Sequence, residues 1–240
     1  MEPNEIDKMN KLEETHWWFQ GKKYIIKSII SGIEVPEGRL LDIGCGTGMF
    51  LDELGKGRTS YGLDLSAQAL SYCAKKVNAL LVRAVGDKLP FKDDVFSLVP
   101  LLDIIEHVEN DFELLKEVYR VCKSQAVVVI TVPAFDFLWG KHDVSHHHKR
   151  RYTCNQLRDL ALSVGFLLER VTYTNFFIFL PVLLRRITSS KSFYGKTSDL
   201  RQAPGIINDL LKCIYRFEAF YLRKAGFPFG VSLLAVLRKP

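Results

Sequence analysis

The chain has 240 residues, of which 48% are hydrophobic and 25% are charged, and its formal net charge is +6. This length and apolar content suffice for one large domain, or one domain with an insertion, with a sizeable core, so a globular enzyme is expected. Five cysteines, an odd number with no CxxC pair, argue against a disulfide framework and a thiolate zinc site, so we expect reduced thiols in a cytoplasmic protein.

The two ends of the chain differ in character. Residues 1–14 are acidic and polar, unlike an export signal, and the longest apolar run, 176–184, is too short to span a bilayer as a helix. Residues 175–240 carry 11 Lys and Arg against 3 Asp and Glu. This excess indicates an anionic partner such as a lipid headgroup, a phosphate-bearing substrate or nucleic acid, and a solvated basic face is the alternative.

Strand-like and helix-like runs alternate from residue 39 to residue 132. We predict strands at 39–43, 59–63, 79–85, 95–101, 126–131, 166–173 and 232–238. Helices are predicted at 50–54, 66–76 with Ser66 as N-cap, 112–121, and about 155–164, ended by Gly165. The alternation predicts an α/β fold with parallel strands joined by crossover helices.

Residues 175–229 are too long for a hairpin loop between the last two predicted strands. We therefore divide the chain into a core with an N-terminal helical lid (1–174), an inserted cap or interface segment (175–229) and a final strand returning to the sheet (230–240).

The run LLDIGCGTG, residues 40–48, joins the first strand to a helix through a glycine turn. Glycines there let the backbone approach a ligand closely, as in nucleotide-binding proteins. The GxGxG spacing of Gly44, Gly46 and Gly48 matches neither the P-loop nor the GxGxxG turn of dehydrogenases. The turn is predicted to cradle a different nucleotide-like cofactor.

Acidic residues lie at the ends of three successive predicted strands: Asp42, Asp64 and Asp87. A carboxylate at Asp64 can accept hydrogen bonds from both ribose hydroxyls, and one at Asp87 can accept from the adenine amino group. The alternative is three unrelated surface acids. Their shared spacing favours one cofactor site along the ligand-binding edge of the sheet.

Four motifs in this order, LLDIGCGTG, YGLDLS, GDKLPF and LLDIIEHVEND, resemble the class I S-adenosylmethionine (SAM) dependent methyltransferases, particularly ubiquinone and menaquinone biosynthesis enzymes. The resemblance covers about residues 16–174 and the last strand. It implies a Rossmann-like, seven-stranded sheet in the order 3-2-1-4-5-7-6 with the last strand antiparallel, and SAM as methyl donor. It also implies these cofactor-binding residues: Asp42, Gly44, Cys45, Gly46, Thr47, Gly48, Asp64, Leu65, Asp87, Lys88, Leu89, Leu102 and Asp103.

The sequence departs from the family pattern FDLV, which reads FSLV at residues 96–99 and is followed by Pro100. Ser97 replaces an acid of local structural importance, and Pro100 removes one strand hydrogen bond. These departures leave open a SAM-binding protein without turnover, acting as a partner or sensor.

Candidate bases cluster in the loop WGKHDVSHHHKRRY, residues 139–152, which resembles an HD…HxRRY pattern of the same branch. His148 or His142 could deprotonate an acceptor hydroxyl. Arg150, Arg151, Tyr152 and Asp143 are the predicted substrate-binding residues, with an arginine holding an anionic group. One alternative is that the histidines order the loop, and another is a metal site at residues 146–148. Because the sequence shows no clear set of partner ligands, we expect no metal.

Three further features of the sequence are His107, the N-terminal aromatic run and residues 176–191. His107 could approach the cofactor, although capping or packing is an equal alternative. Residues 16–19 (HWWF), with Lys22 and Lys23, could form a lid over SAM or an N-terminal helix packed on the sheet. Residues 176–191 suit peripheral contact with the inner face of the membrane, a greasy pocket, an internal core helix or a dimer interface, so the protein is expected to be a monomer or homodimer.

The leading hypothesis is a methyltransferase acting on a small or lipid-linked metabolite, with quinone and surface-polysaccharide synthesis as settings. A nucleic-acid acceptor is disfavoured, because the sequence contains no RNA-binding module and no NPPY-like motif.

Overall fold

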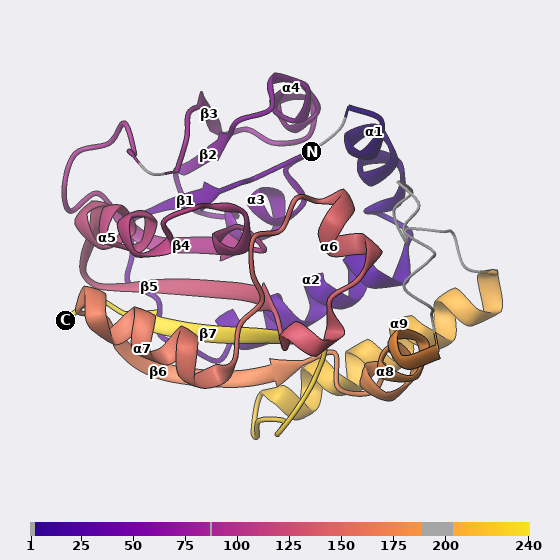
Figure 1. The fold of residues 1–240 in the computed structure, drawn as a ribbon. Helices are drawn as coiled ribbons and strands as arrows, with labels where there is room; N and C mark the ends of the chain where they lie inside the picture. The colour runs from indigo at the N-terminus through magenta and orange to yellow at the C-terminus, as the bar shows by residue number, and fades with distance from the viewer. Residues whose placement is uncertain (1–2, 87, 189–203) are drawn as a thin grey trace.

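The computed structural model describes residues 3–86, 88–188 and 204–240. Its centre is a sheet of seven strands in the order β3-β2-β1-β4-β5-β7-β6 (Figure 1). The strands are β1 (Arg39–Ile43), β2 (Ser60–Asp64), β3 (Leu80–Arg83), β4 (Phe96–Leu102), β5 (Cys122–Pro133), β6 (Leu167–Thr174) and β7 (Ser232–Arg238). Strand β7 pairs antiparallel with both β5 and β6, and the other pairs are parallel. The predicted fold class is confirmed.

Helices cover both faces of this sheet (Figure 1). They are α1 (Pro3–Leu12), α2 (Trp17–Ile30), α3 (Met49–Leu54), α4 (Ala67–Lys76), α5 (Asp111–Val121), α6 (Lys141–Ser145), α7 (Cys154–Val164), α8 (Phe179–Thr188) and α9 (Gly205–Leu222), with short 3-10 turns η1 (Ile105–His107) and η2 (Asp136–Leu138). Leu114 and Leu157 of α5 and α7 pack in one core cluster, and Ile26, Cys73 and Tyr215 of α2, α4 and α9 pack in the other. Each face of the sheet is thereby buried.

The seven predicted strands and four predicted helices are all found, with ends shifted by at most four residues. The Ser66 side chain accepts from the Ala69 amide as an N-cap, and Gly165 ends α7 with a left-handed backbone, as predicted. The largest shift is at β5, which begins at Cys122 rather than at residue 126. The polar residues there hid the strand start, because Lys123, Ser124 and Gln125 are exposed.

The segment before the last strand joins the core through α9. Tyr215 is 1% exposed and packs beside Gly21 of α2, and the Ser28 hydroxyl donates to the Ala219 carbonyl at 2.7 Å. The polar middle of the segment, residues 189–203, lies outside the described residues. No helix in the described ranges is both long and apolar enough to cross a bilayer.

The two departures from the family pattern lie in β4. Ser97 is fully buried, accepts from Arg58 at 3.2 Å and donates to the Arg39 carbonyl at 3.1 Å. Pro100 pairs in register with Val129 of β5. The Ser97 hydroxyl therefore contacts Arg58 at the position where the family pattern has an acid. The pairing of β4 with β5 continues past Pro100.

Candidate active site

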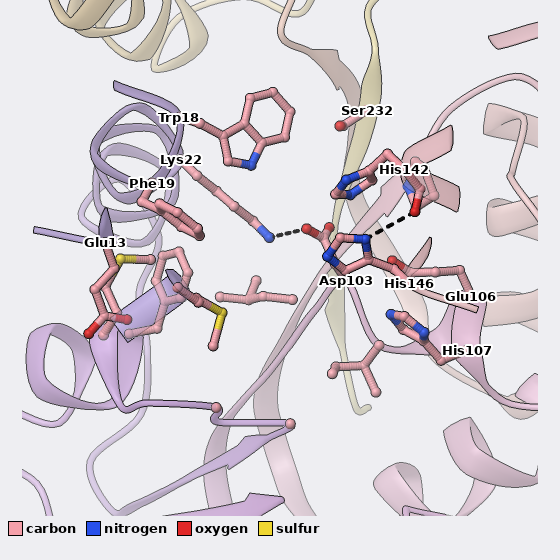
Figure 2. A pocket seen from close by; sticks show the side chains of 18 of the residues that line it. Glu13, Trp18, Phe19, Lys22, Asp103, Glu106, His107, His142, His146 and Ser232 are labelled. Atoms are coloured by element: carbon pink, nitrogen blue, oxygen red, sulfur yellow. Dashed lines mark hydrogen bonds and ion pairs between the residues drawn. The ribbon is translucent and has the colours of Figure 1, made fainter. Parts of the chain in front are cut away.

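A cavity of about 270 Å³ opens at the carboxyl ends of the central strands, between α2 and the loop that follows β5. Figure 2 shows Trp18, Phe19 and Lys22 of α2 on one side, facing Asp103 and a group of histidines on the other. The edge of the sheet at which the sequence predicted a ligand site is thus the edge that carries the cavity.

The glycine turn forms the floor of the cavity. Its backbone takes conformations that residues with side chains disfavour. Gly44, Gly46 and Gly48 have φ of +74°, +54° and +93°. A Cβ atom on Gly44 would lie 1.9 Å from the Ile104 side chain. Only glycine fits at this position without moving its neighbour.

Asp64 holds the turn from the next strand. Its carboxylate accepts from the Gly46 amide at 2.9 Å and from the Ser66 amide at 2.8 Å. The Thr47 hydroxyl donates to Glu13, which also pairs with Lys76, so the segment between α1 and α2 is fastened over the turn. The turn is therefore held from below by β2 and from above by the N-terminal helices.

The predicted cofactor residues divide into two groups. Those on the cavity lining are Gly44, Cys45, Gly46, Thr47, Asp64, Leu102 and Asp103. Those off the lining are Asp42, Gly48, Leu65, Lys88 and Leu89, while Asp87 lies outside the described residues. Burial, with the nearby Asp64 charge, raises the pKa of Asp42 to about 8. The Leu89 side chain is buried and its amide donates to Glu117 at 2.9 Å.

Lys22 and Asp103 form an ion pair across the cavity, with Nζ and Oδ2 2.5 Å apart (Figure 2). Asp103 has a φ of +58° just beyond β4 and also accepts from Thr131 at 2.9 Å. Burial opposes ionisation of Asp103, but Lys22 and Thr131 outweigh it and hold its pKa below the ordinary value. The pair links α2 to the end of the central strand.

Asp143 organises the loop of residues 139–152, here called the histidine loop. Its fully buried carboxylate accepts from the Gly140 amide at 2.7 Å, from Nδ1 of His148 at 2.9 Å, and from Nε and Nη2 of Arg151 at 2.9 Å each. Burial opposes ionisation, but His148 and Arg151 hold the pKa of Asp143 well below its usual range. Because Nδ1 of His148 binds Asp143, Nε2 at the opposite side of the ring is left for the cavity that His148 lines.

The other predicted chemical residues are placed as follows. His142 lines the cavity, and burial together with His146 and His148 lowers its pKa to about 3. Arg151 also lines it, while its guanidinium is paired with Asp143. Arg150 and Tyr152 lie off the lining, and both bind Asp111, at 2.9 and 2.7 Å.

Glu106 is a cavity residue that the sequence reasoning missed. It is fully buried, and neither carboxylate oxygen has a hydrogen-bond partner in the part of the chain that the structure describes. Burial, and then the Asp103 charge, raises its pKa well above the ordinary value. His107, which the sequence suggested as a residue near the cofactor, lines the cavity beside it, and burial lowers the pKa of His107 to about 4. The only signal in the sequence was an acid next to that histidine.

Comparison with known proteins agrees with this geometry. Residues 41–130 match the methyltransferase domain family. This match and the relatives below support a class I SAM-dependent methyltransferase. The chain is 28% identical over 173 residues to an uncharacterised protein of Methanocaldococcus jannaschii, covering 68% of this chain and 82% of that one.

A second relative is the demethylmenaquinone methyltransferase of Halalkalibacterium halodurans, 32% identical over 138 residues, which cover 50% of this chain and 56% of that one. Among solved structures, a SAM-dependent methyltransferase from Thermotoga maritima superposes with a TM-score of 0.63 at 19% identity, covering 99% of this chain and 95% of that one. That likeness shows the shared fold.

Proposed function

We propose that this methyltransferase binds SAM over the glycine turn and transfers its methyl group to a small or lipid-linked metabolite held between α2 and the histidine loop. The glycine cradle fits the cofactor, because the missing Cβ atoms let a ligand approach the backbone of the turn closely. Asp64 would hold the ribose, and Gly44 to Gly48 the methionine part. The bound sulfonium supplies an activated methyl group.

The observation that carries the proposal is the joining of two sets of residues in one cavity. The glycine turn and Asp64 lie at one end, and His142 and His148 line the other. A methyl acceptor placed between them would meet the cofactor and a base together, and such positioning accounts for much of the rate of bimolecular reactions in enzymes.

Within this arrangement, His148 is the proposed base for a hydroxyl acceptor. Asp143 fixes its Nδ1 tautomer through the 2.9 Å contact, which directs Nε2 toward the acceptor. Arg151 acts on the acceptor through Asp143, whose charge it balances. Arg150 and Tyr152 support the loop from Asp111, so a neutral acceptor group suits the cavity better than an anionic one.

The test is isothermal titration with S-adenosylhomocysteine (SAH), the demethylated cofactor, beside Asp64→Asn. We expect micromolar binding by the native protein and about 10- to 100-fold weaker binding by the variant, because hydrogen bonds to a charged group contribute about 1.5–3 kcal/mol. Asp52→Asn, on the exposed side of α3, is the matched control and should bind normally. Equal affinity in Asp64→Asn, or no binding at all, would refute the proposed cofactor site.

A lipid-linked acceptor is favoured by the surface of α8 and α9. The large apolar side chains exposed there include Leu180, Leu184, Ile187, Ile206, Leu210, Phe217 and Phe220. On α9 they recur at spacings of three, four and seven residues, and Arg223 and Lys224 follow the helix. Apolar stripes flanked by basic residues suit the headgroup region of an anionic membrane.

Vesicle sedimentation tests this contact. The protein should bind phosphatidylglycerol vesicles more strongly than phosphatidylcholine vesicles, and Leu210→Ser with Phe217→Ser should release it. Light scattering measures the alternative, in which this surface binds a second copy of the chain. A dimer that the double substitution dissociates, together with no vesicle binding, would contradict the membrane contact and assign the surface to that second copy.

A further inference from the structure

The cavity wall opposite α2 contains a cluster of potential metal ligands. One ligand atom each from Glu106, His107 and His148 lies within 4.8 Å of the other two. Glu106 and His107 belong to the short turn η1 after β4, whereas His148 comes from the loop beyond α6. The fold therefore brings together three ligands, one carboxylate and two imidazoles, from two segments about 40 residues apart.

Glu106 is the independent reason to look for a cation here. A fully buried carboxylate without a hydrogen-bond partner is costly unless it is neutralised. The nearby cation, Lys22, is already paired with Asp103, and Arg151 is paired with Asp143. Among the described residues around the cavity, Glu106 is thus a buried acid without a cationic partner, and a bound metal ion would neutralise it.

The surroundings of His148 match those of a metal-bound imidazole. Histidine ligands usually donate their second ring nitrogen to a carboxylate, which fixes the orientation of the ring. Here Nδ1 of His148 contacts Asp143 at 2.9 Å, and the ring lies edge-on to His107 with the centroids 4.7 Å apart. Nε2 of His148 is thereby left free to bind a metal ion.

We propose that Glu106, His107 and His148 bind a divalent first-row transition metal such as Zn²⁺, Mn²⁺ or Fe²⁺. Two imidazoles and one carboxylate form a recognised ligand set for these ions, and they leave coordination positions open. Ligand atoms about 2.1 Å from a metal lie about 3.4 Å apart, so small side-chain rotations would close the site.

This metal site would extend the proposed function. Its role in methyl transfer rests on that proposed function. The open positions face the cavity and would take an oxygen of the acceptor, such as a phenol or enol. A bound divalent cation stabilises an ionised oxygen. The substrate class inferred is therefore an acceptor that is methylated at an oxygen atom. With the metal bound, His148 would be a ligand, and the metal would replace its proposed role as base by favouring loss of the hydroxyl proton to water.

The experiment uses the full chain, freed of metal by a chelator and titrated with Co²⁺ while the visible absorption of the ion is followed. We expect one equivalent to bind with the intense bands of a low-coordinate cobalt site. Glu106→Gln, which keeps the shape of the side chain, and His148→Asn should each weaken binding about tenfold or more. His147→Asn, an exposed histidine of the same loop that is not in the cluster, is the matched control and should bind as the native protein does.

Unchanged Co²⁺ affinity in Glu106→Gln, or the absence of one-to-one binding by the native chain, would overturn the metal site. An SAH titration of the same samples separates the two proposals. SAH binding without Co²⁺ binding would reject the metal and leave the cofactor site standing. Co²⁺ binding without SAH binding would reject the cofactor site and leave the metal standing.

Discussion

Replacing Asp143 with asparagine tests whether the histidine loop is held by a buried ion pair. The substitution removes the charge that balances Arg151, whose side chain is only 4% exposed. It also places an amide donor where the carboxylate now accepts from the Gly140 amide, His148 and Arg151. Breaking a buried pair by removing one partner typically costs about 3–5 kcal/mol.

This cost converts into a measurable shift of the melting temperature. Unfolding entropy of about 2.1 cal/mol/K per residue gives about 500 cal/mol/K for a chain of this length, so Tm should fall by about 6–10 °C. Differential scanning calorimetry measures the shift. Asp159→Asn is the control, because its pair with Arg158 is exposed and should contribute less than about 1 kcal/mol.

A fall of less than about 2 °C in Asp143→Asn would refute this reasoning, since 1 kcal/mol corresponds to about that shift in a chain of this size. Arg151 would then be free to serve a bound molecule, as the sequence alone suggested. A large fall would identify Asp143 and Arg151 as residues that position His148.

Three further predictions concern α2, α3 and α9. Tyr215→Phe should raise stability by about 1 kcal/mol in calorimetry, because the buried hydroxyl has no hydrogen-bond partner among the described residues, and a loss would reveal one. Gly21→Ala should cost about 1–3 kcal/mol, because its Cβ would lie 2.3 Å from the Tyr215 ring, and unchanged urea unfolding would contradict that packing. The hydrogen bond from Lys27, against the effect of burial, lowers the pKa of Glu53 to about 2. The contribution of the Glu53 carboxylate to stability is therefore complete above pH 4.5 and is lost as pH falls toward 2. The free energy of unfolding, measured with urea, should thus fall more between pH 5 and pH 2 in the native protein than in Glu53→Gln.

The strands and the glycine turn could be predicted because their determinants are local. Branched apolar runs encode buried parallel strands, and Gly44, Gly46 and Gly48 encode a backbone with positive φ. The ordered motifs then gave the sheet order through resemblance. The start of β5 at Cys122 was missed because exposed polar residues interrupt the apolar run there.

The electrostatics of the site could not be predicted, because they depend on pairings between distant residues. Arg150 looked available for a substrate, yet it pairs with Asp111, and Arg151 pairs with Asp143. Glu106 resembles any surface acid in the sequence, and only the packing around η1 reveals that it is buried. A pattern of residue types indicates which charges exist, whereas tertiary structure determines which of them are already neutralised.

The separation of charge in this molecule bears on what each of its surfaces can attract. The excess of basic residues belongs to residues 175–240, while the acids on the cavity lining are Glu5, Glu13, Asp64, Asp103 and Glu106, against Lys22 and Arg151. An anionic partner drawn by the net charge would therefore be attracted to this segment of the chain more than to the acidic lining of the cavity. The cavity instead favours the cationic sulfonium of SAM and a neutral or metal-bound acceptor. The lipid-linked substrate proposed above would suit both surfaces if its anionic portion stayed at the membrane and its methylated group reached the cavity.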